Sequence, residues 1–306
     1  MAFGKINETR ESGVAFKKYV GVAPVKVMAI NPTLKELQDM GMNFTEETKY
    51  ISKTDDGIDQ IRIDIWVKTV ADKCDGIDTM FKIPFILRKK TIIGSATGKY
   101  KIMDIYGQTA WGTKEEIQNK QIPQYATGPA KIDAKYHVLC DGEEELTMFV
   151  RSYLGIPNVL KFANGLPCGM IDNPADAEGT LDHIKDYFTG DISELKEIFK
   201  LAPNNWIKCL VGVKTTDDNK QYQTVFTRGF MSGGANNYKY LSKTLQENLA
   251  IGRYSNVYFG PIIGETVMLN PLAEYQAPVT NVVPTNTPMP NTAAMPPFGE
   301  NDDLPF

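Results

Sequence analysis

The segment QIRIDIWVKTV, at residues 60–70, alternates cleanly between apolar and polar side chains. Successive side chains of a β-strand point to opposite faces, so this pattern predicts a strand with one face in a hydrophobic core. The predicted inner face carries Ile61, Ile63, Ile65 and Val67, and the opposite face carries Arg62, Asp64, Trp66 and Lys68.

Similar strand patterns recur along the chain and predict a protein that is mainly β. Helical patterns are fewer, and two of them, EEELTMFVRSYLG and DISELKEIFK, lie between about 142 and 203. We therefore expect an α+β body with a helical insert in that region. The further strand candidates are KKYVGVAPVKVMAI, TMFKIPFILRKK, GKYKIMDIY, KIDAKYHVLC, WIKCLVGVK, YQTVFTRGF and SNVYFG.

The composition is that of a globular protein, with 42% hydrophobic and 23% charged residues among 306. The first residues are polar and charged, and no apolar run approaches the ~18 to 20 residues that a membrane-spanning helix needs. We therefore expect a soluble, cytoplasmic protein, in the host cytoplasm if a phage encodes it, with no membrane partner.

The C-terminal stretch from Gln276 to Gly299 contains six prolines and no charged residue. Proline fixes φ and lacks an N–H, so this stretch predicts an extended or flexible linker. The expected organisation is a β-rich body at 1–275, a linker at 276–299 and an acidic tip at 300–306. Four of the 37 acidic residues follow Asn270, where no Lys or Arg occurs, so the remaining body is neutral.

No enzyme motif stands out, and we expect neither catalytic activity nor a cofactor. GSATGKYK has the wrong spacing for a phosphate-binding loop, and no nucleophile elbow is present. The four scattered cysteines indicate reduced core thiols. Zinc binding remains an alternative, although His137 and Cys140, three positions apart on a strand, would point to opposite faces.

The chain ends in Asp302, Asp303, Leu304, Pro305 and Phe306, after the charge-free linker. This ending resembles the tail of bacterial and phage single-stranded DNA-binding proteins (SSBs). The resemblance covers only about the last thirty residues and implies a divergent, phage-type member. In that family the tip docks onto replication and repair enzymes. The aromatic ring and terminal carboxylate suit an apolar pocket with a basic rim. A tail that only aids solubility is the alternative.

Single-strand binding needs basic residues beside aromatic rings on which bases can stack. Trp66 on the polar strand face is one such candidate, unless both faces of that strand are buried. A turn between two basic strand ends would gather further cations, although a basic run at a strand end is often only solvated. The complete predicted set is Arg62, Trp66, Lys68, Arg88, Lys89, Lys90, Lys99, Tyr100, Lys101, Tyr222, Phe226, Arg228, Tyr238 and Lys239.

Two further aromatic residues, Tyr106 and Trp111, are interpreted as core residues, the commoner fate of large rings. Tyr222, Phe226 and Arg228 are expected to share one strand face. The interleaving of aromatic and basic residues in a β-rich body fits an OB-fold-like barrel with long loops.

These features predict non-sequence-specific binding of single-stranded DNA in replication or recombination, with partner enzymes recruited through the tip. Self-association is left open. A phage virion or scaffold protein with a docking tail is one alternative. An accessory factor or degenerate nuclease is the other. Salt-sensitive oligonucleotide binding and metal-dependent activity separate these alternatives.

Overall fold

The computed structural model describes residues 17–104, 109–118, 136–155, 182–236, 238–260, 262–263, 266–267 and 269–276. The chain divides into two units, Met1–Tyr275 and Gln276–Phe306. The tip residues Asp302 to Phe306 lie outside the described part. No helix in the described part is long and apolar enough to cross a membrane.

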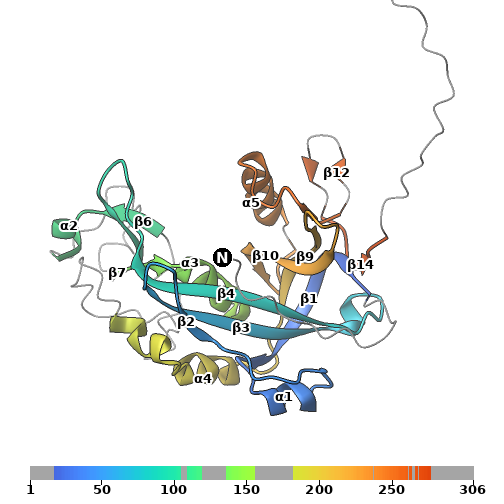
Figure 1. The fold of residues 1–306 in the computed structure, drawn as a ribbon. Helices are drawn as coiled ribbons and strands as arrows, with labels where there is room; N and C mark the ends of the chain where they lie inside the picture. Colours follow the sequence, from blue (N-terminus) through green and yellow to red (C-terminus); the bar gives the residue numbers. More distant parts are fainter. Residues whose placement is uncertain are drawn as a thin grey trace, which may run out of the picture. The chain divides into compact units, whose positions relative to one another are not determined.

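The body is mainly β and is built on one large antiparallel sheet with the strand order β10-β9-β1-β3-β4-β8 (Figure 1). Three short strands, β2, β11 and β14, pair with β3, β9 and β1. The bounds are β1 Tyr19–Ile30, β2 Ile51–Lys53, β3 Asp59–Thr69, β4 Met80–Thr91, β8 Cys140–Asp141, β9 Ile207–Thr215, β10 Gln221–Ser232, β11 Val257–Tyr258 and β14 Ala273–Glu274.

Strand β3 has the inner face that its alternation predicts. Ile61, Ile63, Ile65 and Val67 are all fully buried in the main hydrophobic core. The strand pairs with β4 in an unbroken register from Gln60 opposite Arg88 to Lys68 opposite Met80. Two long strands in continuous register present a wide apolar surface that the rest of the body covers.

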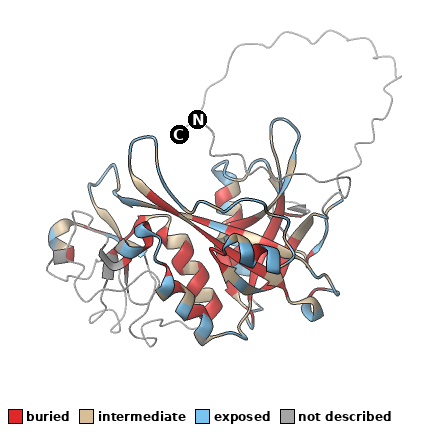
Figure 2. Ribbon diagram, turned by 60° about the horizontal axis from the view of Figure 1, so that its bottom comes forward, coloured by how far each residue is buried: buried red, intermediate tan, exposed pale blue. Residues whose placement is uncertain are grey.

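The sheet curls into a half-barrel around helix α3 (Glu143–Leu154), whose Phe149 contacts two strands that are not neighbours in the sheet, β4 and β10. The Phe149 ring centre lies 5.6 Å from that of Phe85 on β4 and 5.1 Å from that of Phe230 on β10. The rings of Phe85 and Phe230 are themselves 6.1 Å apart. Strands β4 and β10, which are not neighbours in the strand order, therefore meet over one helix. Figure 2 shows buried residues concentrated on the strands of the curled sheet.

The described part of the expected insert contains α3, the 3-10 helix η4 (Asp182–Thr189) and α4 (Ser193–Leu201). Tyr187 and Phe199 from these elements join the main core. A short helix α1 (Leu34–Asp39) precedes β2, and Thr33 begins it with a reciprocal capping box to Glu36. The 3-10 turn η1 (Ala71–Lys73) connects β3 to β4.

Helix α5 (Lys239–Ala250) packs on the other face of the sheet and forms a second core. Its Leu241 and Leu245 contact a cluster that includes Leu210 and Phe226. Phe226 is fully buried there. The expectation that Tyr222, Phe226 and Arg228 share one strand face stays a prediction, but their environments differ. Phe226 is buried under α5, Tyr222 is exposed and Arg228 pairs with Glu145, and the β10 register shifts between Val225 and Phe230.

A small sheet with the order β6-β5-β7 forms a third, minor core with helix α2. Ile102, Ile117 and Val138 fill it. One further hairpin joins β12 to β13. The bounds of these elements are β5 Tyr100–Asp104, β6 Thr109–Gly112, α2 Lys114–Gln118, β7 Tyr136–Val138, β12 Ile262–Ile263 and β13 Thr266–Val267.

The position of Phe149 predicts that Phe149→Ala lowers the free energy of unfolding by about 3–5 kcal/mol, because it leaves a cavity between β4 and β10. Urea denaturation followed by circular dichroism measures this change. The control is Ile251→Ala, whose side chain is largely exposed and which we expect to change stability by less than about 0.5 kcal/mol. Equal effects of the two substitutions would contradict the central role of Phe149.

Candidate nucleic-acid interface

Trp66 lies on the outer face of β3, but it is buried, with 7% of its surface exposed. The Phe44 ring meets it edge-on at 6.0 Å, and the Lys82 ammonium lies 5.9 Å from its ring centre. Of the two alternatives that the sequence allows, the structure shows burial. Trp66 therefore offers no open stacking face in this conformation.

The other polar residues of β3 are engaged with neighbours. The Arg62 guanidinium bonds both oxygens of the buried Asp64 carboxylate, and this pairing raises the pKa of Arg62. Lys68 lies opposite Lys26 of β1 and forms an ion pair with Asp78 at 2.9 Å. Lys26 is exposed and forms no ion pair with a described residue.

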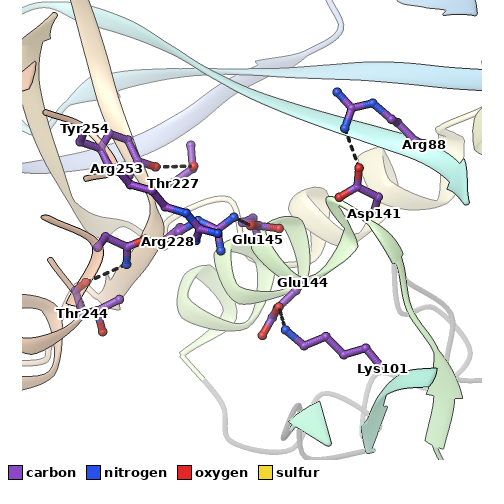
Figure 3. Close-up of polar contacts among 11 residues, drawn as sticks. Arg88, Lys101, Asp141, Glu144, Glu145, Thr227, Arg228, Thr244, Arg253 and Tyr254 are labelled. Atoms are coloured by element: carbon purple, nitrogen blue, oxygen red, sulfur yellow. Dashed lines mark hydrogen bonds and ion pairs between the residues drawn. The ribbon is translucent and has the colours of Figure 1, made fainter. Parts of the chain in front are cut away.

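Three of the predicted DNA-binding cations are held by acids at the start of α3 (Figure 3). Arg88 of β4 bonds Asp141 at 2.5 Å. Arg228 of β10 bonds Glu145 at 2.8 Å. Lys101 of β5 bonds Glu144. These contacts tie three separate strands to one helix end, where acidic residues are also favoured by the helix dipole.

A hairpin follows β4 at the expected glycine-containing turn. The Gly94 N–H donates to the Lys99 carbonyl at 2.8 Å, and the Lys101 N–H donates to the Ile92 carbonyl at 2.9 Å. Because successive side chains of a strand point to opposite faces, Lys99 and Lys101 lie on one face and Tyr100 lies on the other. Tyr100 packs against the minor core. The turn therefore separates the predicted tyrosine from the two lysines.

Trp111 of β6 lies directly opposite Lys101 and so shares the face of Lys99 and Lys101. It is 36% exposed, so its interpretation as a core residue is wrong. Its ring lies against Gly94, where an added Cβ would come within 3.3 Å of the indole. We call Lys89, Lys90, Lys99, Lys101 and Trp111 the hairpin surface.

The hairpin surface also contains cations that no described carboxylate approaches within 4 Å, although Asp59 and Asp56 interact electrostatically with Lys89 and Lys90. Lys89 and Lys90 are exposed at the end of β4 and lead into the hairpin. Lys99 is partly exposed. Among the described residues, none of the three forms an ion pair within 4 Å. This end of the body therefore combines available positive charge with an exposed indole.

The remaining predicted residues lie elsewhere. Tyr222 is exposed on β10, and Lys239 begins α5. Tyr238 is partly buried beside Lys208, a residue that the sequence analysis missed together with Trp206. The alternation of Trp206 and Lys208 in WIKCLVGVK is the signal that could have found them, because it places both on one strand face.

The described cysteines are ordinary buried thiols. Cys74, Cys140 and Cys209 form no disulfide, and no group of three or more potential metal ligands exists among the described residues. Burial raises the pKa of the Cys209 thiol to about 12. Cys168 and the side chains of His137 and His183 lie outside the described part.

Comparison with known proteins leaves the function to be argued from these residues. No protein-family model, curated protein or solved structure matches the chain.

The raised pKa of Cys209 predicts very slow alkylation of the native protein. At pH 8 a thiol with this pKa is almost entirely protonated, with a thiolate fraction on the order of 10⁻⁴, and only the thiolate is a good nucleophile. Iodoacetamide labelling followed by peptide mass spectrometry tests this. We expect rapid labelling in denaturant as the control, and equal rates in both conditions would refute the burial.

Proposed function

We propose that the body binds single-stranded DNA without sequence preference through the hairpin surface. The observation that carries the proposal is the placement of exposed Trp111 on the same sheet face as Lys99, with the exposed Lys89 and Lys90 at the end of β4, while Lys101 on that face is paired with Glu144. An indole offers a stacking face to any base, and adjacent lysines attract the phosphate backbone. Because neither contact reads base identity, this combination supports binding without sequence preference.

The segregation of charge within the body supports this proposal. Acids near α3 pair with Arg88, Lys101 and Arg228. Lys89 and Lys90, at the end of β4, form no ion pair within 4 Å with a described residue. A body with no net charge can attract a polyanion when its unpaired cations gather locally.

We further propose that the half-barrel is a divergent OB-type module. The strands β1, β3 and β4 follow one another, α3 comes next, and β9 then returns to pair with β1 before β10. This order supports a partly open five-stranded Greek-key barrel, a fold that binds oligonucleotides on its second and third strands and adjoining loops. Here the second and third long strands are β3 and β4, and the hairpin surface continues from the latter.

The tip is proposed to recruit replication or recombination proteins. Its aromatic end and acids suit a pocket with a basic rim, and a proline-rich linker lets such a peptide reach partners at a distance. The proposed docking residues are Asp302, Asp303, Leu304, Pro305 and Phe306.

Trp111→Ala is expected to weaken binding of a labelled (dT)20 oligonucleotide by about 5- to 150-fold, because one base–aromatic stack contributes about 1–3 kcal/mol. Fluorescence anisotropy at fixed low salt measures the Kd. The matched control is Tyr240→Ala, which removes an exposed ring on α5 and should leave the Kd unchanged.

An unchanged Kd for Trp111→Ala would place the DNA elsewhere, and an equal loss of binding in Tyr240→Ala would show that the effect is not specific to Trp111. Failure of the unaltered protein to bind at low salt would defeat the proposed function and favour a virion or scaffold role. Tighter binding to duplex DNA than to (dT)20 would also contradict it, because a duplex leaves no unstacked base for Trp111.

The acidic tip is expected to compete with DNA for the basic surface. Changing Asp302 and Asp303 to Asn should tighten (dT)20 binding at low salt, because it removes two negative charges that repel the strand. The difference should shrink at high salt through screening. Parallel anisotropy titrations at both salt concentrations measure it. An unchanged Kd at low salt would show that the tip and DNA do not compete.

A further inference from the structure

Lys208 of β9 is a buried cation, with 9% of its surface exposed. Its ammonium donates to the Ala235 carbonyl at 2.5 Å and to the Asn236 side-chain oxygen at 3.1 Å. Both acceptors are neutral. No described carboxylate lies within 4 Å of it, although several acids occur at this end of the sheet.

Two aromatic rings also lie beside this ammonium. It lies 5.7 Å from the ring centre of Trp206 and 5.3 Å from that of Tyr238. Cation–π contact offsets part of the loss of hydration that burial imposes. A buried ammonium has three donors, and its two neutral acceptors leave its charge without a counter-ion.

A second cation shares the Trp206 ring. The Lys73 ammonium, from η1, lies 5.2 Å from the ring centre. Its acidic neighbour is the exposed Asp72, at 3.9 Å. Nearby, Lys68 is paired with Asp78. The acids of this region thus lie beside the outer lysines, and the buried ammonium of Lys208 has none.

The loop after β10 packs closely onto the indole. A Cβ added at Gly233 would come within 2.4 Å of the Trp206 ring, so a side chain here would displace it. The same loop supplies both neutral acceptors for Lys208. The arrangement therefore holds one ammonium in place and keeps one indole beside two cations.

We propose that Lys208 and Lys73, beside Trp206, each bind a backbone phosphate of the single strand. A phosphate supplies the negative charge that the buried ammonium lacks, and lysine binds phosphate as a point charge. This inference rests on the proposed function and adds a second contact region to it.

The second region lies at the opposite end of β4 from the hairpin surface. Ile207, the neighbour of Lys208, pairs with Val25 of β1, and Val25 pairs with Thr69 at the end of β3. The Thr69 N–H donates to the carbonyl of Thr79, which comes just before β4, so Lys208 lies near the start of β4. The hairpin surface begins where β4 ends. A strand of 12 residues spans roughly 35–40 Å, so one DNA strand would follow the outer face between the two regions.

The salt dependence of (dT)20 binding tests this proposal. Each phosphate contact to a single strand contributes about 0.7 to the slope of log K against log salt. We expect Lys208→Gln and Lys73→Gln each to reduce the slope by about that amount, and Lys208→Arg to preserve it. Lys243→Gln is the matched control, because Lys243 is exposed on α5 with Glu247 as its partner, and its slope should equal that of the unaltered protein.

Thermal melting by circular dichroism establishes that each variant is folded at the temperature of the titration. If Lys208→Gln unfolds, the slope of Lys73→Gln still tests the proposal. The Lys73 side chain is exposed and makes none of the contacts that Lys208 makes with the loop after β10. Unchanged slopes in the folded lysine variants, with normal binding by the unaltered protein, would overturn this inference alone. Absence of binding by the unaltered protein would instead defeat the proposed function.

Discussion

The packing of α3 inside the curled sheet is the interaction on which the rest of the body depends. Phe149 contacts β4 and β10, which are far apart in the strand order, so the helix determines how strongly the sheet curls. Apolar burial provides the driving force. The acids around the first turn of α3 form ion pairs with cations from three strands. Hydrophobic burial is non-directional, so these ion pairs add a preferred orientation of the helix against the sheet.

This packing also determines which positive charges remain for a ligand. Arg88, Lys101 and Arg228 resemble DNA-binding residues in the sequence, yet each has a carboxylate partner near α3. Among the described residues, cations without a close ion pair remain in the hairpin surface at one end of β4, and the buried Lys208 lies beside Trp206 at the other. The fold thereby gives a body with no net charge a local excess of positive charge, and the proposed DNA path connects these two regions.

The two tryptophans Trp66 and Trp111 show how far sequence reasoning can reach. The alternation of β3 correctly predicts its inner face, because period two is a local property of an extended chain. Whether its outer face is open depends on Phe44, which comes from a distant segment and covers Trp66. Trp111 was expected in the core, but it lies in a small sheet whose other face carries the minor core. Phe226 is buried for the same kind of reason, since α5 covers it.

The sequence by itself determined the predominance of strands, the inner face of β3 and the turn after β4, because these follow from local side-chain periodicity and glycine. It also determined the proline-rich composition from Gln276 onward and the acidic Pro-Phe ending. Only the tertiary structure decided which rings are exposed and which cations are paired. Those properties depend on contacts between residues far apart in the chain, such as Lys101 with Glu144 or Lys208 with Ala235, and no local pattern encodes them.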